Sequence, residues 1–384
     1  MKLRFNFRLV FLVVLLGALA IREVALELRP SFLRPGLHMF AYVGNSADGT
    51  VSAIDLIKLA SFAKVPVGSG PSGLRAHPTR PEIWGVSSGG GYVWVLDCPS
   101  NRIVAQIAVG RDPYALDFSP DGRLVYVAAS GTNDVLAIDT RSRKVTARSY
   151  AGRRPWIARV SPDGKTIVVS NRDDATVSIL NAVNLTQIAV VPTVPDPEQI
   201  VILPDNSKAF VTSGTANQIS VVDLKQKVLL TNLALGGPPS DLILKPDGGE
   251  LYIPSRETHG LVIVNTSTNE VSDFLLLGMS PTAATFDAST DTLYVSDFDA
   301  DHVVPVSVAT RQVGRPIQAG DGPATLRLTP GGDILLVVDI NSDDLAVIRT
   351  KTLQTGQASL SPPRPPTGLI PLGGEPRDLA IKVF

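Results

Sequence analysis

Residues 110–150 read GRDPYALDFSPDGRLVYVAASGTNDVLAIDTRSRKVTARSY and contain the signals for four short strands. The apolar runs that predict these strands are 114–119, 124–128, 135–138 and 145–150. The first two runs are separated by Pro120-Asp121-Gly122, a turn in which proline presets φ and glycine supplies a positive φ. Asp139 ends the third run, and its carboxylate is expected to cap the turn that follows. Four short antiparallel strands in one unit are the content of a propeller blade.

The same unit recurs along almost the whole chain with a period of 42 residues. The prolines that mark it are Pro71, Pro113, Pro155, Pro197, Pro239, Pro281 and Pro323. A fixed period in this range indicates one supersecondary unit repeated many times. A helical solenoid is excluded because no segment has a long 3.6-residue period. A parallel β-helix is a weaker alternative, because its repeats are usually shorter and need end caps.

The two ends of the chain supply one split blade. Residues 376–382 repeat the first-strand sequence of 239–245 and have no second strand after them. Near the other end, 40–43 and 51–54 read as a second and a third strand. Pairing the two ends would close the ring and remove two exposed sheet edges. The sequence therefore predicts an all-β, eight-bladed propeller of four-stranded antiparallel blades, with seven blades as the alternative.

The domain boundaries follow from the ends of the repeat. Residues 1–20 are predicted to be a signal peptide, because basic residues precede an apolar run that ends near Ala18-Leu19-Ala20. An uncleaved anchor is the alternative, although the run is short for a membrane span. Residues 21–37 form a lead-in, and 38–384 form the propeller. A proline-rich insertion at about 359–371 reads as a stiff surface loop or as a docking peptide.

Composition and motifs exclude several classes of function. The net charge of −1 gives no overall attraction to nucleic acid. Cys98 is the single cysteine, so an internal disulfide is excluded. The sequence lacks a Gly-x-Ser-x-Gly elbow, a glycine-rich phosphate loop and His-Glu-x-x-His. It also lacks Cys-x-x-Cys-His, which excludes covalent attachment of heme c. These absences favour a non-catalytic protein over an enzyme.

The repeat resembles a known family. Tyr42-Val43-Gly44-Asn45 and Tyr294-Val295-Ser296-Asp297 are similar to a Tyr-Val-Thr-Asn motif, with Pro-Asp-Gly turns before such segments and Val-rich strands after them. The chain resembles the YVTN-family β-propellers over about 38–384, and at repeat level it is similar to lactonase-like propellers. Members of the family are typically exported prokaryotic proteins. The resemblance therefore implies a periplasmic, secreted or cell-surface location.

Candidate functional residues lie where loops depart from the repeat. In a propeller, the loops from a fourth strand to the next first strand share a face with the loops between second and third strands, and ligands commonly bind there over the axis. The residues expected to bind a ligand are Arg111, Arg154, Trp156, Arg172, Glu198 and Arg377. Arg256 and His259 are the weaker candidates for catalysis.

Two acidic loops suggest a metal site. The candidate ligands are Asp297, Asp299, Asp301, Asp339, Asn341 and Asp343. Their alternating oxygen side chains suit Ca²⁺, although the glycine and glutamate of an EF-hand loop are missing. Solvated turn residues are the competing interpretation. The expectation is therefore that the protein has no cofactor, with Ca²⁺ as an open alternative.

The sequence favours an exported, non-catalytic binding or scaffold protein that recognises its ligand or partner on the loop face. The expected partner is an envelope protein or a small polar ligand, with no role for nucleic acid. Contact with a membrane is expected only through an uncleaved signal anchor. The alternative function is a lactonase-like hydrolase of sugar lactones.

Overall fold

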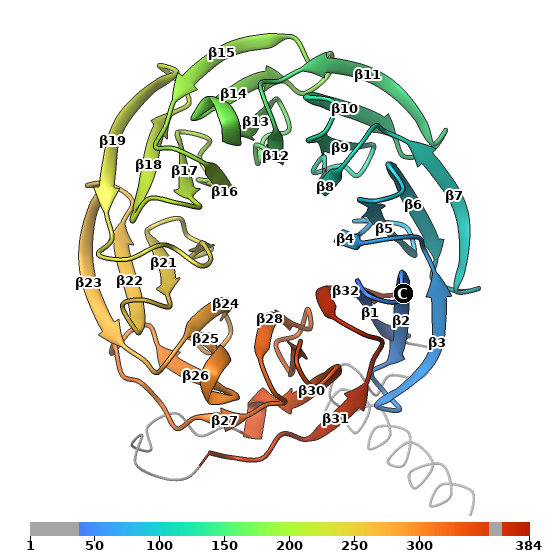
Figure 1. The fold of residues 1–384 in the computed structure, drawn as a ribbon. Helices are drawn as coiled ribbons and strands as arrows, with labels where there is room; N and C mark the ends of the chain where they lie inside the picture. Colours follow the sequence, from blue (N-terminus) through green and yellow to red (C-terminus); the bar gives the residue numbers. More distant parts are fainter. Residues whose placement is uncertain (1–37, 353–362) are drawn as a thin grey trace, which may run out of the picture.

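The computed structural model describes residues 38–352 and 363–384, and these form eight four-stranded antiparallel sheets arranged as a ring (Figure 1). The eight-bladed propeller predicted from the 42-residue period is confirmed, and the seven-bladed alternative is excluded. The possibility that 30–37 forms a strand lies outside the described residues.

The blades are numbered in chain order, with the split blade last. Blades 1 to 4 contain β4 (Pro71–Ala76), β5 (Glu82–Ser87), β6 (Tyr92–Asp97) and β7 (Arg102–Ala108); β8 (Pro113–Phe118), β9 (Leu124–Ala129), β10 (Asp134–Asp139) and β11 (Lys144–Tyr150); β12 (Pro155–Val160), β13 (Thr166–Asn171), β14 (Thr176–Asn181) and β15 (Gln187–Pro192); and β16 (Pro197–Ile202), β17 (Lys208–Ser213), β18 (Gln218–Asp223) and β19 (Val228–Ala234). Blades 5 to 8 contain β20 (Ile243–Leu244), β21 (Glu250–Ser255), β22 (Gly260–Asn265) and β23 (Glu270–Leu276); β24 (Pro281–Asp287), β25 (Thr292–Asp297), β26 (His302–Ser307) and β27 (Ile317–Gln318); β28 (Pro323–Leu328), β29 (Ile334–Asp339), β30 (Asp344–Arg349) and β31 (Gly368–Pro371); and β32 (Pro376–Val383) with β1 (Met39–Asn45), β2 (Thr50–Asp55) and β3 (Ala60–Pro66). Short 3₁₀ turns are η2 (Arg172–Asp174), η3 (Phe298–Ala300) and η4 (Thr350–Thr352).

The strands of blade 2 begin and end within about one residue of the predicted runs. The turn after β10 has the expected cap, because Asp139 Oδ1 accepts a hydrogen bond from Ser142 N at 2.6 Å. Asp55 and Asn181 accept equivalent hydrogen bonds from Lys58 N and Asn184 N in blades 8 and 3. The Asp or Asn of each of these repeats is therefore a turn residue, as the sequence predicts.

The two ends of the chain pair in blade 8. Strand β32 lies antiparallel to β1, with Met39 opposite Val383 and Tyr42 opposite Ala380. In Figure 1 the first and last strands lie side by side and close the ring. The rings of Phe40 and Phe384 pack edge to face at 5.5 Å between centroids. The predicted closure is thus made by both hydrogen bonds and apolar packing.

Large side chains fill the wedges between neighbouring blades. One position in each second strand is buried and usually aromatic, and its occupants are Tyr42, Trp84, Tyr126, Val168, Phe210, Tyr252, Tyr294 and Leu336. Burying a side chain of this size contributes about 1.5–3 kcal/mol. The tyrosine of the repeated motif is therefore a packing residue and carries no information on chemistry.

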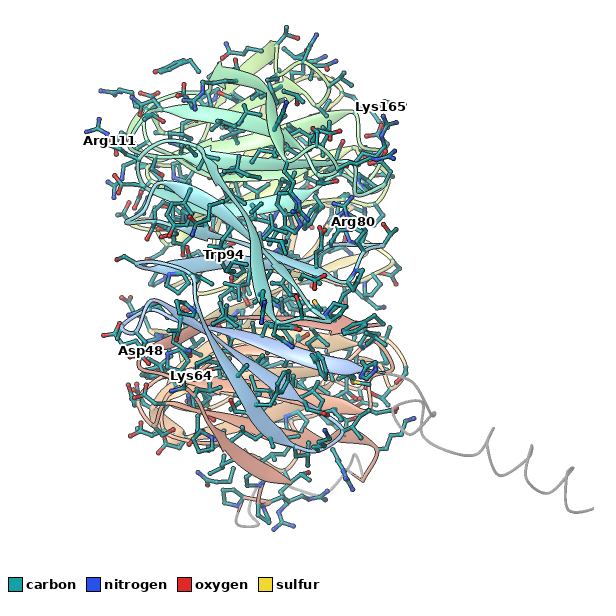
Figure 2. All side chains as sticks on the ribbon, turned by 90° about the vertical axis from the view of Figure 1, so that its right-hand side faces the viewer. Asp48, Lys64, Arg80, Trp94, Arg111 and Lys165 are labelled. Carbon is teal, nitrogen blue, oxygen red and sulfur yellow. The ribbon has the colours of Figure 1, made fainter. Side chains whose placement is uncertain are left out.

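Two kinds of loop define two opposite faces. Asp48, between β1 and β2, and Arg111, between β7 and β8, lie on one side of the disc, whereas Arg80 and Lys165 lie on the other side (Figure 2). We call the side of Asp48 and Arg111 the upper face. The upper face contains the loops before each first strand and the loops between second and third strands, which are the two sets that the sequence singles out. Every first strand therefore begins at this face.

The repeat is irregular near its end. Strand β20 has only two residues in place of six, and β27 also has only two. Arg364, in the described part of the proline-rich insertion, pairs with β27 through a bridge to Ile317. That part of the insertion therefore extends the outer edge of blade 6, while 353–362 lie outside the described residues. No helix in the described ranges is long and apolar enough to cross a membrane.

Candidate functional site

The inner segments of all eight blades line a central cavity of about 700 Å³. One repeat position, four residues after each blade's marker proline, falls on the strand that runs down the channel wall. Along blades 1 to 7 this position holds Arg75, Asp117, Arg159, Val201, Ile243, Thr285 and Arg327, and all of these except Asp117 line the cavity. Three arginines thus face one cavity from blades 1, 3 and 7.

The three arginines retain most of their hydrogen-bonding capacity. Arg75 Nη1 donates to Leu74 O at 2.8 Å, and Arg327 Nη1 donates to Leu326 O at 2.9 Å. Arg159 Nε donates to Ile200 O at 3.2 Å. A guanidinium carries five N–H groups, so each arginine can still donate to a ligand.

The cavity is lined by four arginines, Arg377 included, and by two aspartates, Asp241 and Asp378, so positive side chains outnumber negative ones. Burial lowers the pKa of Arg159; among the nearby charges, Asp117 and Asp241 oppose this shift, whereas Arg75 and Arg327 add to it. Burial also lowers the pKa of Arg327, and Arg75 lowers it further, whereas Asp378 and Asp241 oppose the shift. The arginines remain charged, because a guanidinium does not lose its proton in proteins. An anion that entered the cavity would relieve this repulsion.

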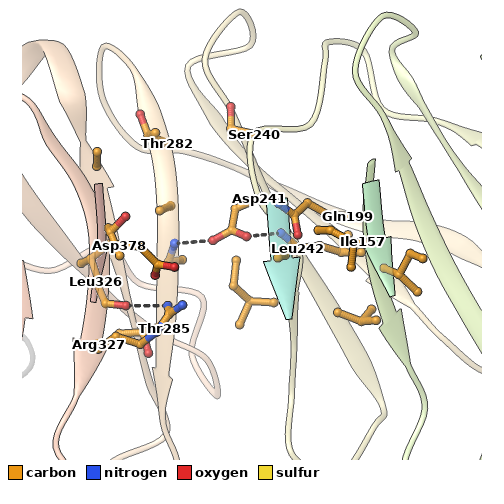
Figure 3. A pocket seen from close by; sticks show the side chains of 18 of the residues that line it. Ile157, Gln199, Ser240, Asp241, Leu242, Thr282, Thr285, Leu326, Arg327 and Asp378 are labelled. Carbon is orange, nitrogen blue, oxygen red and sulfur yellow. Dashed lines mark hydrogen bonds between the residues drawn. The ribbon is translucent and has the colours of Figure 1, made fainter. Parts of the chain in front are cut away.

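Three aspartates join neighbouring blades, and two of them, Asp241 and Asp378, line the cavity. Asp117 Oδ2 accepts from Val160 N at 3.1 Å, and Asp378 Oδ2 accepts from Leu74 N at 2.8 Å. Asp241 Oδ2 accepts from Ala284 N at 3.2 Å, and burial raises the pKa of this carboxyl (Figure 3). Each carboxylate therefore links its own blade to the inner strand of the next one. The nearest distances from arginine to aspartate, Arg75–Asp378 and Arg159–Asp117, are 3.9 Å.

An aromatic pair stands at the upper rim of the cavity. The rings of Tyr114 and Trp156 stack at 3.7 Å between centroids and 19° between planes. Arg172 covers the other face of Trp156, with Cζ 4.5 Å from the ring centroid. Arg172 also pairs with Asp196 and lies 2.9 Å from Glu198 Oε1. This stack is held from both sides and presents a flat edge beside the cavity.

A second hollow of about 420 Å³ adjoins the aromatic pair on the upper face. Its wall contains Tyr114 and Trp156, together with Asp112 and Arg154. Tyr114 also lines the central cavity, so the two hollows share one wall. Burial raises the pKa of Tyr114, and the side chain is a neutral phenol at neutral pH.

The structure places the six predicted ligand-binding residues on or near this region. Trp156, Arg172 and Glu198 form one contact group, and Arg377 lines the central cavity. Arg154 lines the second hollow, and Arg111 Nη2 donates to Gly131 O in its wall at 3.1 Å. The guanidinium of Arg172 is engaged by two carboxylates, which raise its pKa and favour a positioning role. Whether these six residues bind a ligand stays a prediction.

Arg256 and His259 lie in the upper-face loop of blade 5, and neither lines the central cavity. His259 Nδ1 lies 2.5 Å from Met279 O. Arg256 Cζ lies 4.6 Å above the ring of Phe298. Their contacts are with the protein's own loops, and their catalytic role stays a prediction.

The acidic loops are occupied mostly by hydrogen bonds to the backbone. Asp297 is buried and accepts from Met279 N at 2.8 Å and Ser280 N at 2.6 Å. Asp301 and Asp343 accept from Gly322 N and Glu375 N, whereas Asn341 Nδ2 donates to Asp321. Asp299 is exposed. In the described part of the chain, no group of three or more His, Cys, Asp or Glu residues could hold a metal ion.

Asp339 differs from the other acidic candidates. It is fully buried and lies opposite Asp344 on the neighbouring strand. Burial raises its pKa, and the Asp344 carboxyl raises it further. At the equivalent place in blade 3, Asn171 Nδ2 donates to Thr176 Oγ1 at 3.1 Å and to Ser178 Oγ at 2.9 Å. Blade 7 thus has an aspartate, Asp339, at the repeat position where blade 3 has an uncharged asparagine, Asn171.

Sequence reasoning missed Arg75, Arg159 and Arg327. The missing signal was available in the repeat, because these residues are separated by multiples of 84, which is two blades. It required attention to the strand that faces the axis and not only to the loops.

The fold and the cavity define a class: an eight-bladed propeller with charged side chains along its axis. Residues 85–238 match the family model of the cytochrome D1 heme domain. Among solved structures, dihydro-heme d1 dehydrogenase NirN in complex with DHE is similar, with a TM-score of 0.73 and 16% identity over 88% of this chain and 74% of that chain. Kuenenia stuttgartiensis hydrazine synthase is similar with a TM-score of 0.58 and 17% identity over 73% of this chain and 95% of that chain. No curated protein matches the sequence.

These comparisons correct two expectations. A non-catalytic scaffold and its lactonase-like alternative are both wrong, because residues 85–238 match the model of the cytochrome D1 heme domain. The expectation of no cofactor, with Ca²⁺ as the open alternative, is wrong for the same reason. Both errors arose because propellers of different function share the same turn and strand motifs. The small-ligand part of the partner prediction agrees with these findings, whereas an envelope protein and a membrane anchor gain no support from them.

The cavity residues suit the carboxylate side chains of a heme-type group but not its iron. Guanidinium groups match the carboxylate side chains of a tetrapyrrole, and Arg75, Arg159 and Arg327 supply three. Axial ligands to heme iron are usually His, Cys, Met or Tyr. None of the described His, Cys and Met residues lines the cavity, and Tyr114 is a neutral phenol. The arginines therefore fit the acidic substituents of the ring, although Asp241 and Asp378 share the cavity, and none of the described His, Cys and Met side chains is placed to ligate iron.

Proposed function

We propose that this protein binds a carboxylated tetrapyrrole of the heme d1 type in its central cavity. The observation that carries the proposal is the set of three arginines from alternate blades that converge on one cavity of about 700 Å³. The match of residues 85–238 to the cytochrome D1 heme domain supports this class of ligand.

The arginines would bind the acidic side chains of the ring. A guanidinium binds a carboxylate through two parallel hydrogen bonds, which fix both the distance and the orientation. Each such charged hydrogen bond contributes about 1.5–3 kcal/mol. The aspartates stay engaged with backbone amides of the next blade, so they hold the wall in place while the arginines turn to the ligand.

The aromatic pair would limit how the ring enters. Tyr114 and Trp156 stand at the rim between the two hollows, and Arg172 holds Trp156 from behind. A flat macrocycle can pass or stack along this edge, whereas a bulky globular ligand would collide with it.

Binding of a carboxylated porphyrin tests the proposal directly. Coproporphyrin, with one propionate on each pyrrole ring, should bind to the purified protein and shift its Soret band. Arg327→Gln should weaken binding by about 10-fold or more, since it removes a charged hydrogen-bond donor from the cavity. Arg102→Gln is the matched control, because Arg102 is exposed on the outer strand β7. Equal affinities for the two variants would contradict the proposal.

We also propose that the protein is exported and related to the YVTN propellers. The basic and apolar residues of 1–20 and the repeated Tyr-Val segments support these two proposals. Sequencing the amino terminus of the mature protein tests export: cleavage after Ala20 supports it, and an intact Met1 in the cytoplasmic fraction contradicts it.

A further inference from the structure

Building on the proposed function, we propose that the cavity recognises its tetrapyrrole by the carboxylate periphery alone, so that metal-free and iron-containing rings bind equally well. The ligand class then includes metal-free tetrapyrroles. The argument rests on where this chain places each of its soft or basic donor side chains.

The described histidines are all engaged elsewhere. His77 lies in the loop after β4, on the lower face, where its Nδ1 accepts from Arg80 N at 3.0 Å. His302 Nε2 lies 3.6 Å from Asp297 Oδ2, and its Nδ1 lies 2.8 Å from Ala300 O. His38 stacks on Phe384 at 5.4 Å, where the ring is closed. His259 is bound to Met279 O on the upper face of blade 5.

The described sulfur ligands are also remote from the cavity. Cys98 is fully buried in the core that includes Tyr42 and Trp94, between blades 8 and 1. Met39 is buried in the core between blades 7 and 8. Met279 is exposed in the loop before β24 and does not line the cavity. Tyr114 is therefore the nearest oxygen donor of the kinds that bind heme iron, and burial disfavours its anionic form.

In contrast, three arginines are placed to bind the acidic substituents at the periphery of the ring. Arg75, Arg159 and Arg327 occupy the same position on alternate blades, so their directions differ by multiples of about a quarter turn around the axis in an eight-bladed ring. A tetrapyrrole has the same approximate fourfold arrangement of side chains. A ring lying across the axis would therefore meet a guanidinium in three of four quadrants, and none of the described His, Cys and Met side chains lines the cavity.

The consequence is a difference in selectivity. A site that ligates iron prefers the iron form strongly, because an axial bond is lost when the metal is removed. At a site that binds only the carboxylates, the affinity depends on the number and position of the carboxylates and does not depend on the metal. Such a site can hold a ring before or after a separate reaction that inserts the metal.

The test compares three forms of one ring. Metal-free coproporphyrin, its zinc complex and its iron(III) complex are titrated into the purified protein, with fluorescence quenching and absorbance as readouts. We expect dissociation constants within about threefold of one another. We also expect the bound iron form to lack the low-spin spectrum of an imidazole-ligated heme. His259→Ala should leave all three affinities unchanged.

The failures of the two proposals are distinguishable. Preference for the iron form by more than about tenfold, a low-spin spectrum or a loss confined to the iron form in His259→Ala would each overturn the inference and leave ring binding intact. Absence of binding by all three forms, or no effect of Arg327→Gln on any of them, would overturn the proposed function and this inference with it.

Discussion

Blade 3 and blade 5 carry the same strand position into the cavity and fill it with opposite chemistry. Blade 3 presents Arg159 from the six-residue strand β12. Two blades further on, blade 5 presents Ile243 from the two-residue strand β20. The fold tolerates both because this position borders the hollow, although Ile243 also packs against the core between blades 5 and 6. The difference teaches that the repeat fixes where the side chain lies and leaves its chemistry free.

The contrast also breaks the symmetry of the cavity. Arg75, Arg159, Ile243 and Arg327 occupy four equivalent places, and one of the four has no charge. Near Ile243, the Asp241 carboxylate accepts from Leu242 N at 2.8 Å and from Ala284 N. A ligand with acids on three sides would therefore bind in one rotation, with its least acidic edge at blade 5.

The largest expected effect comes from making the two blades alike. Arg159→Gln should weaken coproporphyrin binding by about 10- to 100-fold, because a buried charge-assisted hydrogen bond is lost. Ile243→Gln changes the equivalent place in blade 5 and should alter affinity by less than about threefold. Isothermal titration of both variants at one salt concentration measures the difference. Similar losses in the two variants would show that the cavity is not asymmetric.

A smaller gain is expected from the reverse change. Ile243→Arg should strengthen binding of uroporphyrin, which carries acids on every ring, by about tenfold, since a fourth guanidinium faces the ligand. Thr285→Arg, which places the charge on blade 6 between two quadrants, is the control and should have the weaker effect. Soret titrations of the two variants decide the point, and an equal gain in both would reduce the effect to net charge.

Blades 3 and 7 offer the same kind of contrast at the upper face, with the smallest expected effect. The pKa of Asp339 is raised from 3.8 to about 9, so the folded protein binds a proton that the unfolded chain has lost over that range. Stability should therefore fall as the pH rises between these values and level off above them. Asp339→Asn introduces the side chain that blade 3 carries at Asn171. This variant should lack the fall and should be more stable than the native protein at pH 9.

Urea unfolding at pH 6 and pH 9 checks this prediction. Asp299→Asn is the control, because Asp299 is exposed in the neighbouring acidic loop. An unchanged difference between the two pH values in Asp339→Asn would show that Asp339 is ionised in the folded protein.

The strands, turns and closure could be predicted from the sequence because each depends on local signals. Proline and glycine set the turns, alternating apolar residues set the strands, and the split repeat set the ring. The site was less accessible. Trp156, Arg172 and Glu198 were found because they depart from the loop pattern, and the structure brings them into contact. Arg75 and Arg327 were missed because they lie within strands that otherwise look ordinary.

Sequence by itself determined the propeller architecture and favoured eight blades over seven, since the 42-residue period ends in a split unit whose two parts can pair, and the structure has eight blades. It could not determine that residues up to 252 positions apart, such as Arg75 and Arg327, share one cavity. Only the closed ring brings these charges within reach of each other, because electrostatic interaction depends on distance in space and on burial. The 42-residue period therefore predicts the fold, whereas the site depends on the closure of the ring, which brings distant residues into one cavity.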